Sequence, residues 1–310
     1  MNNQKTIIKL IHFSGTGLHT GLMANVTLKP APANFGIQFC RTDLDPTLFV
    51  PARSENVYNT NRSTSIKKYD VEIITIEHLL SALYALGIDN CLIEIDNKEI
   101  PILDGSTKFY VDAIWNQNVL ELNQPKKIII IKDVIEWKDE STGAEYIFLP
   151  NEHFSVTCLI DFPSKMIKHQ YAVLNDIQEY KNEIASAKTF CFLHEIEYLY
   201  NNGLIKGGNL NNALVFSETA LSKEKIKWLS TTFHQSANSI PEMGILNPLN
   251  QTYDNEAARH KLLDVIGDLA LTQTYFQGKL IAYKPGHTSN CKFAQFLVEN
   301  YLKVEVEHSF

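Results

Sequence analysis

The chain has 310 residues, 45% of them hydrophobic, which is enough to build one large or two medium-sized globular domains. Its 28 basic and 35 acidic residues give a formal net charge of -7. A surface that binds a polyanion is therefore not indicated, and nucleic acid is not expected as a partner. Any anionic substrate would have to meet a few local lysine or arginine residues.

The start of the chain carries no targeting pattern. Its short apolar run is interrupted by Lys9 and His12, and no stretch of the chain predicts a signal peptide or a membrane span. The five cysteines are widely scattered, odd in number and without a C-x-x-C pair. This usage predicts free thiols in a reducing environment and favours a cytoplasmic location.

The first part of the chain mixes strand and helix patterns. Apolar runs bounded by turn residues predict strands at 6–15, 24–32 and 91–96. Apolar residues at helical spacing predict helices over 76–88 and 107–116. The polar, proline-containing stretch LELNQPKK then indicates a boundary near residue 124.

The second part repeats this order of elements. Strands are expected at 126–137, 145–150, 154–162 and 279–287. Helices are expected within 181–203 and over 255–271 and 290–302. The pattern predicts an α+β fold of two similar domains, 1–124 and 125–310, each a sheet with helices on one face.

The predicted helix at 255–271 has an unusual polar stripe. His260, Asp264 and Asp268 are four residues apart and fall within roughly 80° of arc, opposite a row of leucine, valine and isoleucine residues. An ordinary surface stripe would be rich in lysine and glutamate. An imidazole and two carboxylates are instead metal ligands or proton carriers, although a solvent-facing polar stripe would look the same.

Two further segments concentrate residues of the same kind. Glu77 and His78 lie at the start of the helix at 76–88, and His287 lies at the end of the strand at 279–287. His260 and Asp264 lie one helical turn apart, and His78 would complete a His/His/Asp set that leaves one position open, as in a catalytic zinc site. Ligands without thiolate also suit Fe(II).

Proton carriers stand beside these candidate ligands in the sequence. Glu77 could accept a proton from an attacking water, and His287 could donate one to a leaving amine. Asp268 could hold His287 in one tautomer and keep it cationic. Each segment also has an ordinary interpretation, as a helix cap, a polar helix face or a loop.

Read together, the segments closely resemble the UDP-3-O-acyl-N-acetylglucosamine deacetylases, the bacterial zinc amidases of the lipid A pathway. The matching stretches are SGTGLHTG, LKPAPANFGIQFCRTDL, TIEHLLSALYALGIDN, PILDGS, AKTFCFLHEIEYLYNNGLIKGGNLNNALVF, ARHKLLDVIGDLAL and YKPGHTSN. They follow the family order and cover nearly the whole chain. The pattern ends near Tyr301, so a dehydratase domain, which some relatives carry after the deacetylase, is not expected within this chain.

The resemblance implies a fold and a set of residue roles. Both domains would share a layered β-α-α-β plan, with helices packed between two sheets and the site at the domain junction. The implied zinc ligands are His78, His260 and Asp264. The other implied roles are Glu77 as general base, His287 as general acid with Asp268 as its partner, Thr189 as oxyanion stabiliser, and Phe190 as the aromatic residue packed against the sugar.

The resemblance also implies a reaction and a substrate. The expected activity is hydrolysis of the N-acetyl group of UDP-3-O-(3-hydroxyacyl)-N-acetylglucosamine with release of acetate, the committed step of lipid A biosynthesis. Lys261 and Lys284 are the cations expected at the diphosphate. Leu204 and Leu210, within an insert at about 195–216, are expected to line an apolar channel for the acyl chain, although a simple surface hairpin is the alternative.

Two other functions stay open at this stage: a metal-dependent amidase for a different N-acyl nucleotide-sugar, and a zinc-stabilised scaffold without activity. Glu77 and His287 argue against the scaffold, because neither is needed to hold a structural metal. We expect a monomer that contacts the inner membrane leaflet transiently, without stable insertion. Neither the acyl-chain length nor the choice between zinc and iron follows from the sequence.

Overall fold

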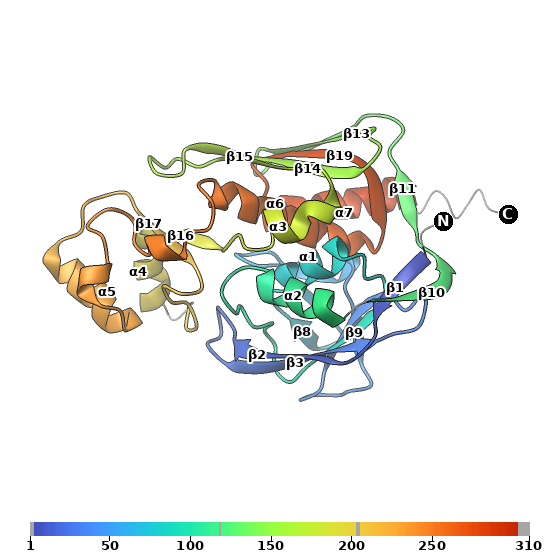
Figure 1. The fold of residues 1–310 in the computed structure, drawn as a ribbon, viewed down its shortest axis with the longest axis horizontal. Coiled ribbons are helices and arrows are strands. Elements are labelled where there is room, and N and C mark those ends of the chain that lie inside the picture. The colour runs from blue at the N-terminus through green and yellow to red at the C-terminus, as the bar shows by residue number, and fades with distance from the viewer. Residues whose placement is uncertain (1–2, 118, 203–204, 303–310) are drawn as a thin grey trace.

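The computed structural model describes residues 3–117, 119–202 and 205–302. Two large sheets form the outer layers of the main body, and helices lie between them (Figure 1). The fold class predicted from the sequence, α+β with helices between two sheets, is confirmed.

The sheet of the first half has the strand order β2-β3-β9-β4-β5. Its strands are β2 (Ile11–Thr16), β3 (Met23–Pro30), β9 (Cys91–Ile95), β4 (Ile37–Arg41) and β5 (Phe49–Pro51). The central strand β9 runs antiparallel to β3 and parallel to β4. Two hairpins are thus joined by a strand that comes later in the chain.

The sheet of the second half repeats this arrangement with the order β12-β13-β19-β14-β15. Its strands are β12 (Ile135–Asp139), β13 (Ala144–Leu149), β19 (Tyr275–Tyr283), β14 (Phe154–Asp161) and β15 (His169–Leu174), with β11 (Ile128–Ile130) beside β19. The central strand β19 is antiparallel to β13 and parallel to β14. The two halves therefore share one topology, as the order of elements in the sequence predicts.

The helices occupy equivalent positions in the two halves. In the first half α1 (Glu77–Ala85) precedes the central strand and α2 (Lys108–Gln117) follows it. In the second half α6 (Glu256–Leu269) and α7 (His287–Leu297) do the same, and a π-helical turn at Val298–Leu302 continues α7. These four helices form the middle layer in Figure 1.

Helices α1 and α6 cross at very short range. Gly267 has no side chain, and a Cβ built on it would lie 2.2 Å from the carbonyl oxygen of Glu77. Glycine therefore allows the two backbones to touch at this point. The crossing places the start of α1, which carries Glu77 and His78, against the polar stripe of α6.

The remaining elements are smaller. β1 (Asn3–Ile7) pairs with β10 (Val119–Pro125), and β6 (Val57–Asn59), β7 (Ser65–Lys68) and β8 (Val71–Ile73) form a separate sheet. Short helices are η1 (Ser54–Asn56), η2 (Ile177–Glu179), α3 (Tyr180–Glu183), η3 (Ala237–Ser239), η4 (Pro248–Asn250) and η5 (Ala270–Thr272). The domain boundary predicted near residue 124 falls inside β10, and it stays a prediction.

A third unit projects from one end of the layers (Figure 1). It contains the sheet β16-β17-β18, made of β16 (Phe190–Phe192), β17 (Leu214–Ser217) and β18 (Gly244–Ile245), with helices α4 (Leu193–Asn201) and α5 (Lys223–Phe233). It has a small core of its own, which includes Ile196, Val215 and Leu229. The acyl-channel insert predicted at 195–216 is thus part of a larger unit.

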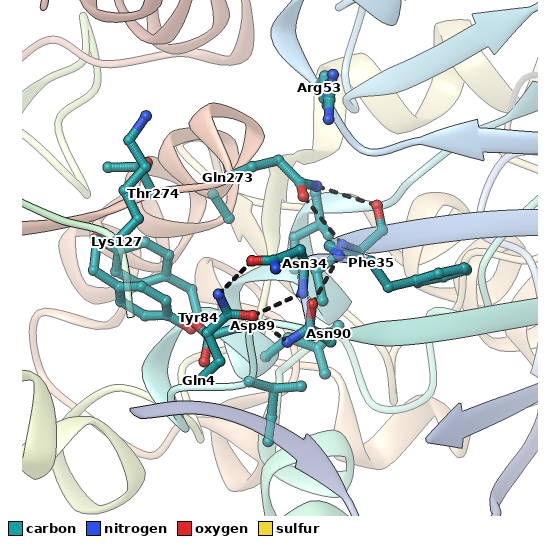
Figure 2. A pocket seen from close by; sticks show the side chains of 17 residues that line it. Gln4, Asn34, Phe35, Arg53, Tyr84, Asp89, Asn90, Lys127, Gln273 and Thr274 are labelled. Carbon is teal, nitrogen blue, oxygen red and sulfur yellow. Dashed lines mark hydrogen bonds between the residues drawn. The ribbon is translucent and has the colours of Figure 1, made fainter. Parts of the chain in front are cut away.

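The two halves are also joined by a polar side chain a few residues after the end of α6. Gln273 accepts a hydrogen bond from the backbone N–H of Ile37 and donates to the carbonyl oxygens of Ile37 and Ala52. Figure 2 shows this side chain at the wall of a pocket that both halves line with polar and apolar residues. None of the predicted site residues that the structure describes lines this pocket.

The structure divides two of the predicted strands and reveals others. The run at 6–15 breaks between β1 and β2, and the run at 126–137 breaks between β11 and β12. The strands β4 to β8, β15 and those of the third unit were not predicted, because they are short and lack a clear period-two pattern. Strand β10 was not predicted either, because its polar, proline-containing residues indicated a boundary. Among the described residues, no helix has the length and hydrophobicity to cross a membrane.

Candidate metal centre and active site

The polar stripe of α6 faces the interior of the protein. His260, Asp264 and Asp268 have exposed fractions of 2%, 1% and 0%. Helix α6 lies in the middle layer, so all of its residues except Arg259 and Lys261 are buried. The interpretation of these residues as an ordinary solvent-facing stripe is therefore wrong.

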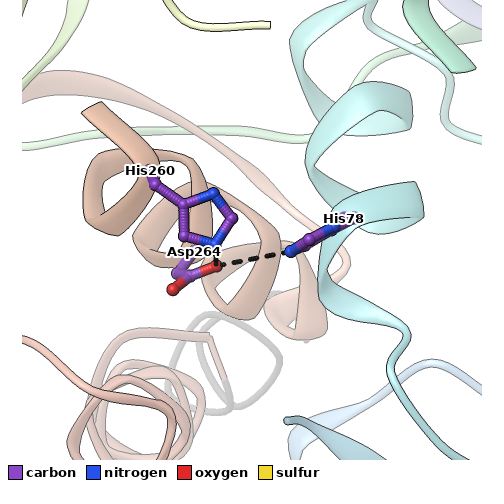
Figure 3. A group of neighbouring side chains, drawn as sticks. All are labelled: His78, His260 and Asp264. Atoms are coloured by element: carbon purple, nitrogen blue, oxygen red, sulfur yellow. Dashed lines mark ion pairs between the residues drawn. The ribbon is translucent and has the colours of Figure 1, made fainter. Parts of the chain in front are cut away.

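Three side chains of the predicted metal site converge at the α1–α6 crossing (Figure 3). The Nε2 atoms of His78 and His260 lie 3.9 Å and 3.5 Å from Oδ1 of Asp264, and one ligand atom from each residue lies within 4.8 Å of the others. His260 donates its Nδ1–H to the carbonyl oxygen of Ala187 at 3.1 Å, which leaves the Nε2 lone pair facing the other two residues.

This donor set fits a divalent metal ion. Oδ1 of Asp264 is buried and has no hydrogen-bond partner among the residues that the structure describes, although an unpaired buried carboxylate oxygen is costly. Burial and the neighbouring His260 lower the pKa of His78 to about 3, and burial also lowers the pKa of His260. Two neutral imidazoles and a carboxylate oxygen can therefore all act as ligands at neutral pH.

The other oxygen of Asp264 is held by a lysine. The Lys261 Nζ donates to Oδ2 at 2.8 Å, and its side chain is 18% exposed. Burial would raise the pKa of Asp264, but the positive charge of Lys261 and the neighbouring histidines together outweigh this, and the pKa is lowered. Lys261 thus keeps the candidate ligand ionised, in addition to the diphosphate role predicted from the sequence.

His287 and Asp268 form a buried pair next to this centre. Nδ1 of His287 donates to Oδ2 of Asp268 at 2.9 Å, and its Nε2 lies 3.9 Å from both Oε1 of Glu77 and Oδ2 of Asp264. Burial opposes protonation of His287, but the charges of Asp268 and Asp264 and the hydrogen bond raise its pKa to about 9. The ring is therefore cationic at neutral pH, with Nε2–H directed away from Asp268.

Glu77 occupies the opposite side of the same space. Its Oε2 accepts the backbone N–H of Thr64 at 3.0 Å, and its other oxygen faces His287. Burial raises the pKa of Glu77 to about 7. A carboxyl group with this pKa can both take up and release a proton near neutral pH.

One pocket collects most of the predicted residues. Eight of them line it: Glu77, His78, Thr189, Phe190, His260, Lys261, Asp264 and His287. Asp268 lies behind His287 and does not line the pocket. Lys284 also falls outside the lining, and its Nζ forms an ion pair with Asp161 at 2.8 Å.

A second, mostly apolar pocket adjoins the first. Both pockets are lined by Leu18, His19, Arg62, Thr189 and Phe190. The second pocket extends into the third unit, where the predicted Leu210 lines it. Leu204, also predicted there, lies outside the described residues.

The loop that carries Leu18 and His19 is fixed by a buried carboxylate. Glu99 is 1% exposed and accepts the backbone N–H groups of His19 and Thr20 at 2.9 Å and 2.8 Å. Gly207 lies so close that a Cβ on it would be 2.1 Å from the carbonyl oxygen of Gly17. The first half and the third unit thus meet above the two pockets.

Several site residues escaped the sequence analysis. Arg62 lines both pockets and forms an ion pair with Glu195 at 3.1 Å, and Thr64 contacts both Glu77 and Asp268. No spacing in the sequence connects either residue to the helices. Asn290 donates to Oδ2 of Asp268 at 2.8 Å and lies one helical turn after His287 in α7. The sequence analysis placed His287 in a strand and began the helix at residue 290, so this spacing was not recognised.

Comparison with known proteins shows which family the sequence of this chain matches. Residues 4–232 and 228–299 match the family described as LpxC: UDP-3-O-acyl N-acetylglycosamine deacetylase. The chain belongs to this family. The resemblance inferred from the sequence motifs is confirmed.

Individual relatives can be aligned with almost all of this chain. The protein named "Bifunctional enzyme LpxC/FabZ" from Bacteroides thetaiotaomicron is 45% identical over 95% of this chain and 64% of its own length. The protein of that name from Porphyromonas gingivalis is 42% identical over 96% of this chain and 64% of its own length. The "UDP-3-O-acyl-N-acetylglucosamine deacetylase" of Pseudoalteromonas atlantica is 39% identical over 97% of this chain and 91% of its own.

The extent of these matches differs between the two groups of relatives. The chain spans less than two thirds of the length of the bifunctional proteins, but nine tenths of the deacetylase from Pseudoalteromonas atlantica. The matched residues include all those that line the pocket at the candidate metal centre.

Proposed function

We propose that this chain hydrolyses the N-acetyl group of UDP-3-O-(3-hydroxyacyl)-N-acetylglucosamine and releases acetate, in the committed step of lipid A biosynthesis. The observation that carries the proposal is the buried His78/His260/Asp264 set with Glu77 and His287 on either side of one pocket. The names of the relatives support the substrate.

His78, His260 and Asp264 would hold the metal ion, for which we propose zinc, with Fe(II) as the alternative. The bound ion would supply Lewis-acid polarisation of the amide carbonyl and would make a water molecule more acidic. Oδ1 of Asp264, which has no hydrogen-bond partner in the described part of the chain, and the two inward Nε2 atoms support this assignment.

Glu77 and His287 would move the protons of the reaction. Amide hydrolysis needs a base that takes a proton from the attacking water and an acid that protonates the departing nitrogen, since a free amide anion is a very poor leaving group. Glu77, with a pKa near 7, suits the first role. His287, protonated below about pH 9 with its Nε2 facing the pocket, suits the second.

Thr189 and Phe190 would contact the reacting end of the substrate. Both backbone groups of Thr189 are hydrogen-bonded, to the carbonyl oxygen of Gly105 and the N–H of Leu214, so its side chain is presented by a fixed backbone. Its hydroxyl would stabilise the developing oxyanion. The Phe190 ring lies 6.4 Å from the His260 ring and would pack against the sugar.

The charged and apolar parts of the substrate would occupy different regions. Lys261, which lines the catalytic pocket, and Lys284, which precedes the lining residue Pro285 in the chain, would bind the diphosphate. The apolar pocket, with Leu210 in its wall, would hold the acyl chain, and Leu204 is proposed for the same wall. The shared lining of the two pockets supports a ligand that spans both.

We also propose a cytoplasmic monomer in contact with the inner leaflet only transiently. The five cysteines are all free, and four of them are buried, which suits a reducing compartment. Sedimentation of the purified chain would test the monomeric state.

Acetate release from UDP-3-O-(3-hydroxyacyl)-N-acetylglucosamine tests the function, with and without a chelator and after zinc or Fe(II) is restored. Glu77→Gln should lose about 10²–10⁴-fold in kcat with its metal retained, since it removes a general base and leaves the ligands intact. Glu94→Gln, which loses a charge in an ion pair with Lys29, is the control and should match the parent. Cleavage of non-acylated UDP-N-acetylglucosamine in place of the acylated compound would show a different substrate.

A further inference from the structure

Thr64 connects the two proton-carrying sides of the candidate active site, with its backbone N–H on Glu77 and its hydroxyl on Asp268 and His287. We propose that Thr64 is a positioning residue that fixes the Asp268 carboxylate, and through it the His287 ring, relative to Glu77. The proposal rests on the proposed function, since it concerns the rate of the same reaction.

The contacts of Thr64 run in both directions. Its backbone N–H donates to Oε2 of Glu77 at 3.0 Å, and its Oγ1 donates to Oδ1 of Asp268. The same Oγ1 lies 3.2 Å from Nδ1 of His287. A single residue thus contacts the candidate base, the candidate acid and the carboxylate that orients the acid.

The backbone of Thr64 is itself anchored at the start of α1. Its carbonyl oxygen accepts the N–H of Ile76, one residue before Glu77, and its side chain is completely buried. Movement of Thr64 relative to Glu77 would therefore break two hydrogen bonds of the Thr64 backbone, one with the Glu77 carboxylate and one with the backbone of Ile76. The position of the hydroxyl is therefore fixed as well.

Asp268 depends on that hydroxyl for one of its two oxygens. Oδ2 accepts from both His287 and Asn290, whereas Oδ1 accepts from Thr64. Asn290 is in turn held by the Tyr146 hydroxyl. Asp268 is fully buried, so loss of the Thr64 hydroxyl would remove the donor to its Oδ1. The carboxylate could then rotate about its Cβ–Cγ bond and move the His287 ring with it.

Thr64→Val tests the hydroxyl, because valine keeps the shape and the backbone N–H to Glu77. We expect kcat to fall by about ten- to a hundredfold, the effect of losing a hydrogen bond to a buried charge. KM and bound metal should stay unchanged, since neither the pocket lining nor the metal ligands change. Thr64→Ser should restore kcat to within about threefold of the parent.

A matched control is available at Thr107, which is equally buried. Its hydroxyl contacts the carbonyl oxygen of Ala185 and the Tyr180 hydroxyl, away from the catalytic pocket. Thr107→Val removes a buried hydroxyl without touching Asp268 and should retain the kcat of the parent. A similar fall in kcat in both valine variants would overturn the proposal.

A double-mutant cycle separates positioning from general structural damage. If Thr64 acts through Asp268, Thr64→Val should cost nothing further in an Asp268→Asn background. An equal loss of kcat in both backgrounds overturns the proposal. A Thr64→Val variant also overturns it if it keeps the kcat of the parent, if it loses its metal, or if its KM changes and its kcat does not.

Two further outcomes are covered by the same experiment. If Thr64→Val does not fold, the ratio of kcat between Thr64→Ser and Thr64→Ala replaces it, where a ratio of about ten or more supports the proposal and a ratio near one overturns it. An inactive parent protein with metal bound would instead contradict the proposed function, and the two failures are thereby distinguished.

Discussion

Gly267 is the point at which the contact between α1 and α6 can be tested most directly. A Cβ at this position would lie 2.2 Å from the carbonyl oxygen and 2.9 Å from the carbonyl carbon of Glu77. Ordinary contacts begin at 3.4 Å, so Gly267→Ala must push the two backbones apart by about 1 Å. Neither atom belongs to a flexible side chain that could move aside.

The expected cost follows from what each helix carries. Helix α1 supplies Glu77 and His78, and α6 supplies His260 and Asp264. Overpacking of this kind costs about 1–3 kcal/mol of stability. A displacement of about 1 Å between the groups of an active site can cost about 10²-fold in rate, and it would also separate the metal ligands.

The assay for Gly267→Ala combines bound metal per chain, the unfolding midpoint and kcat/KM, and all three should fall. Gly208→Ala is the control for metal and stability, since a Cβ there meets its nearest neighbours at 3.5 Å. In the absence of a clash, alanine inside a helix would stabilise the protein by about 1 kcal/mol. A Gly267→Ala protein that is more stable than the parent and keeps its metal would refute the reasoning.

Other predictions concern protons, metal and substrate. Because the pKa of Glu77 is raised to about 7 and that of His287 to about 9, kcat/KM should rise as pH approaches 7, where the base loses its proton, and fall above 9, where the acid loses its own. Asp268→Asn should move the alkaline limb of this profile down by about 1–3 pH units, and an unmoved limb would contradict the pairing. His78→Ala should lower bound metal more than 10-fold, or roughly 1.4 kcal/mol, as measured by competition with a chelator, and full retention would exclude it as a ligand. Leu210→Trp should raise KM for the acylated substrate by narrowing the apolar pocket, and an unchanged KM would place the acyl chain elsewhere.

Local patterns predicted the helices that build the centre. The file of His260, Asp264 and Asp268 is a property of the α-helix, in which residues four apart share a face whatever surrounds them. The repeated order of elements likewise predicted two halves of one plan, and the strand orders of the two sheets agree with it. Helix α5 shows that a local signal was also overlooked, since Ser222 caps it by accepting the N–H of Lys225.

The family motifs in the sequence linked segments that local patterns could not connect. Periodicity alone did not show that His78 approaches His260 across 182 positions of chain, and the ordinary interpretations as cap, polar face and loop stayed open. The structure removes the polar-face interpretation of α6, because its stripe is enclosed between two sheets.

Burial and long-range approach were decided only by the tertiary structure. The pKa shifts of Glu77 and His287 arise from desolvation and from charges on other elements, so no short window of sequence contains their cause. Thr64 and Arg62 reach the site from loops with no periodic pattern. Helical spacing is set by covalent geometry and can therefore be predicted from a short segment of sequence. The contact between α1 and α6 at Gly267 instead depends on how two sheets enclose their helices.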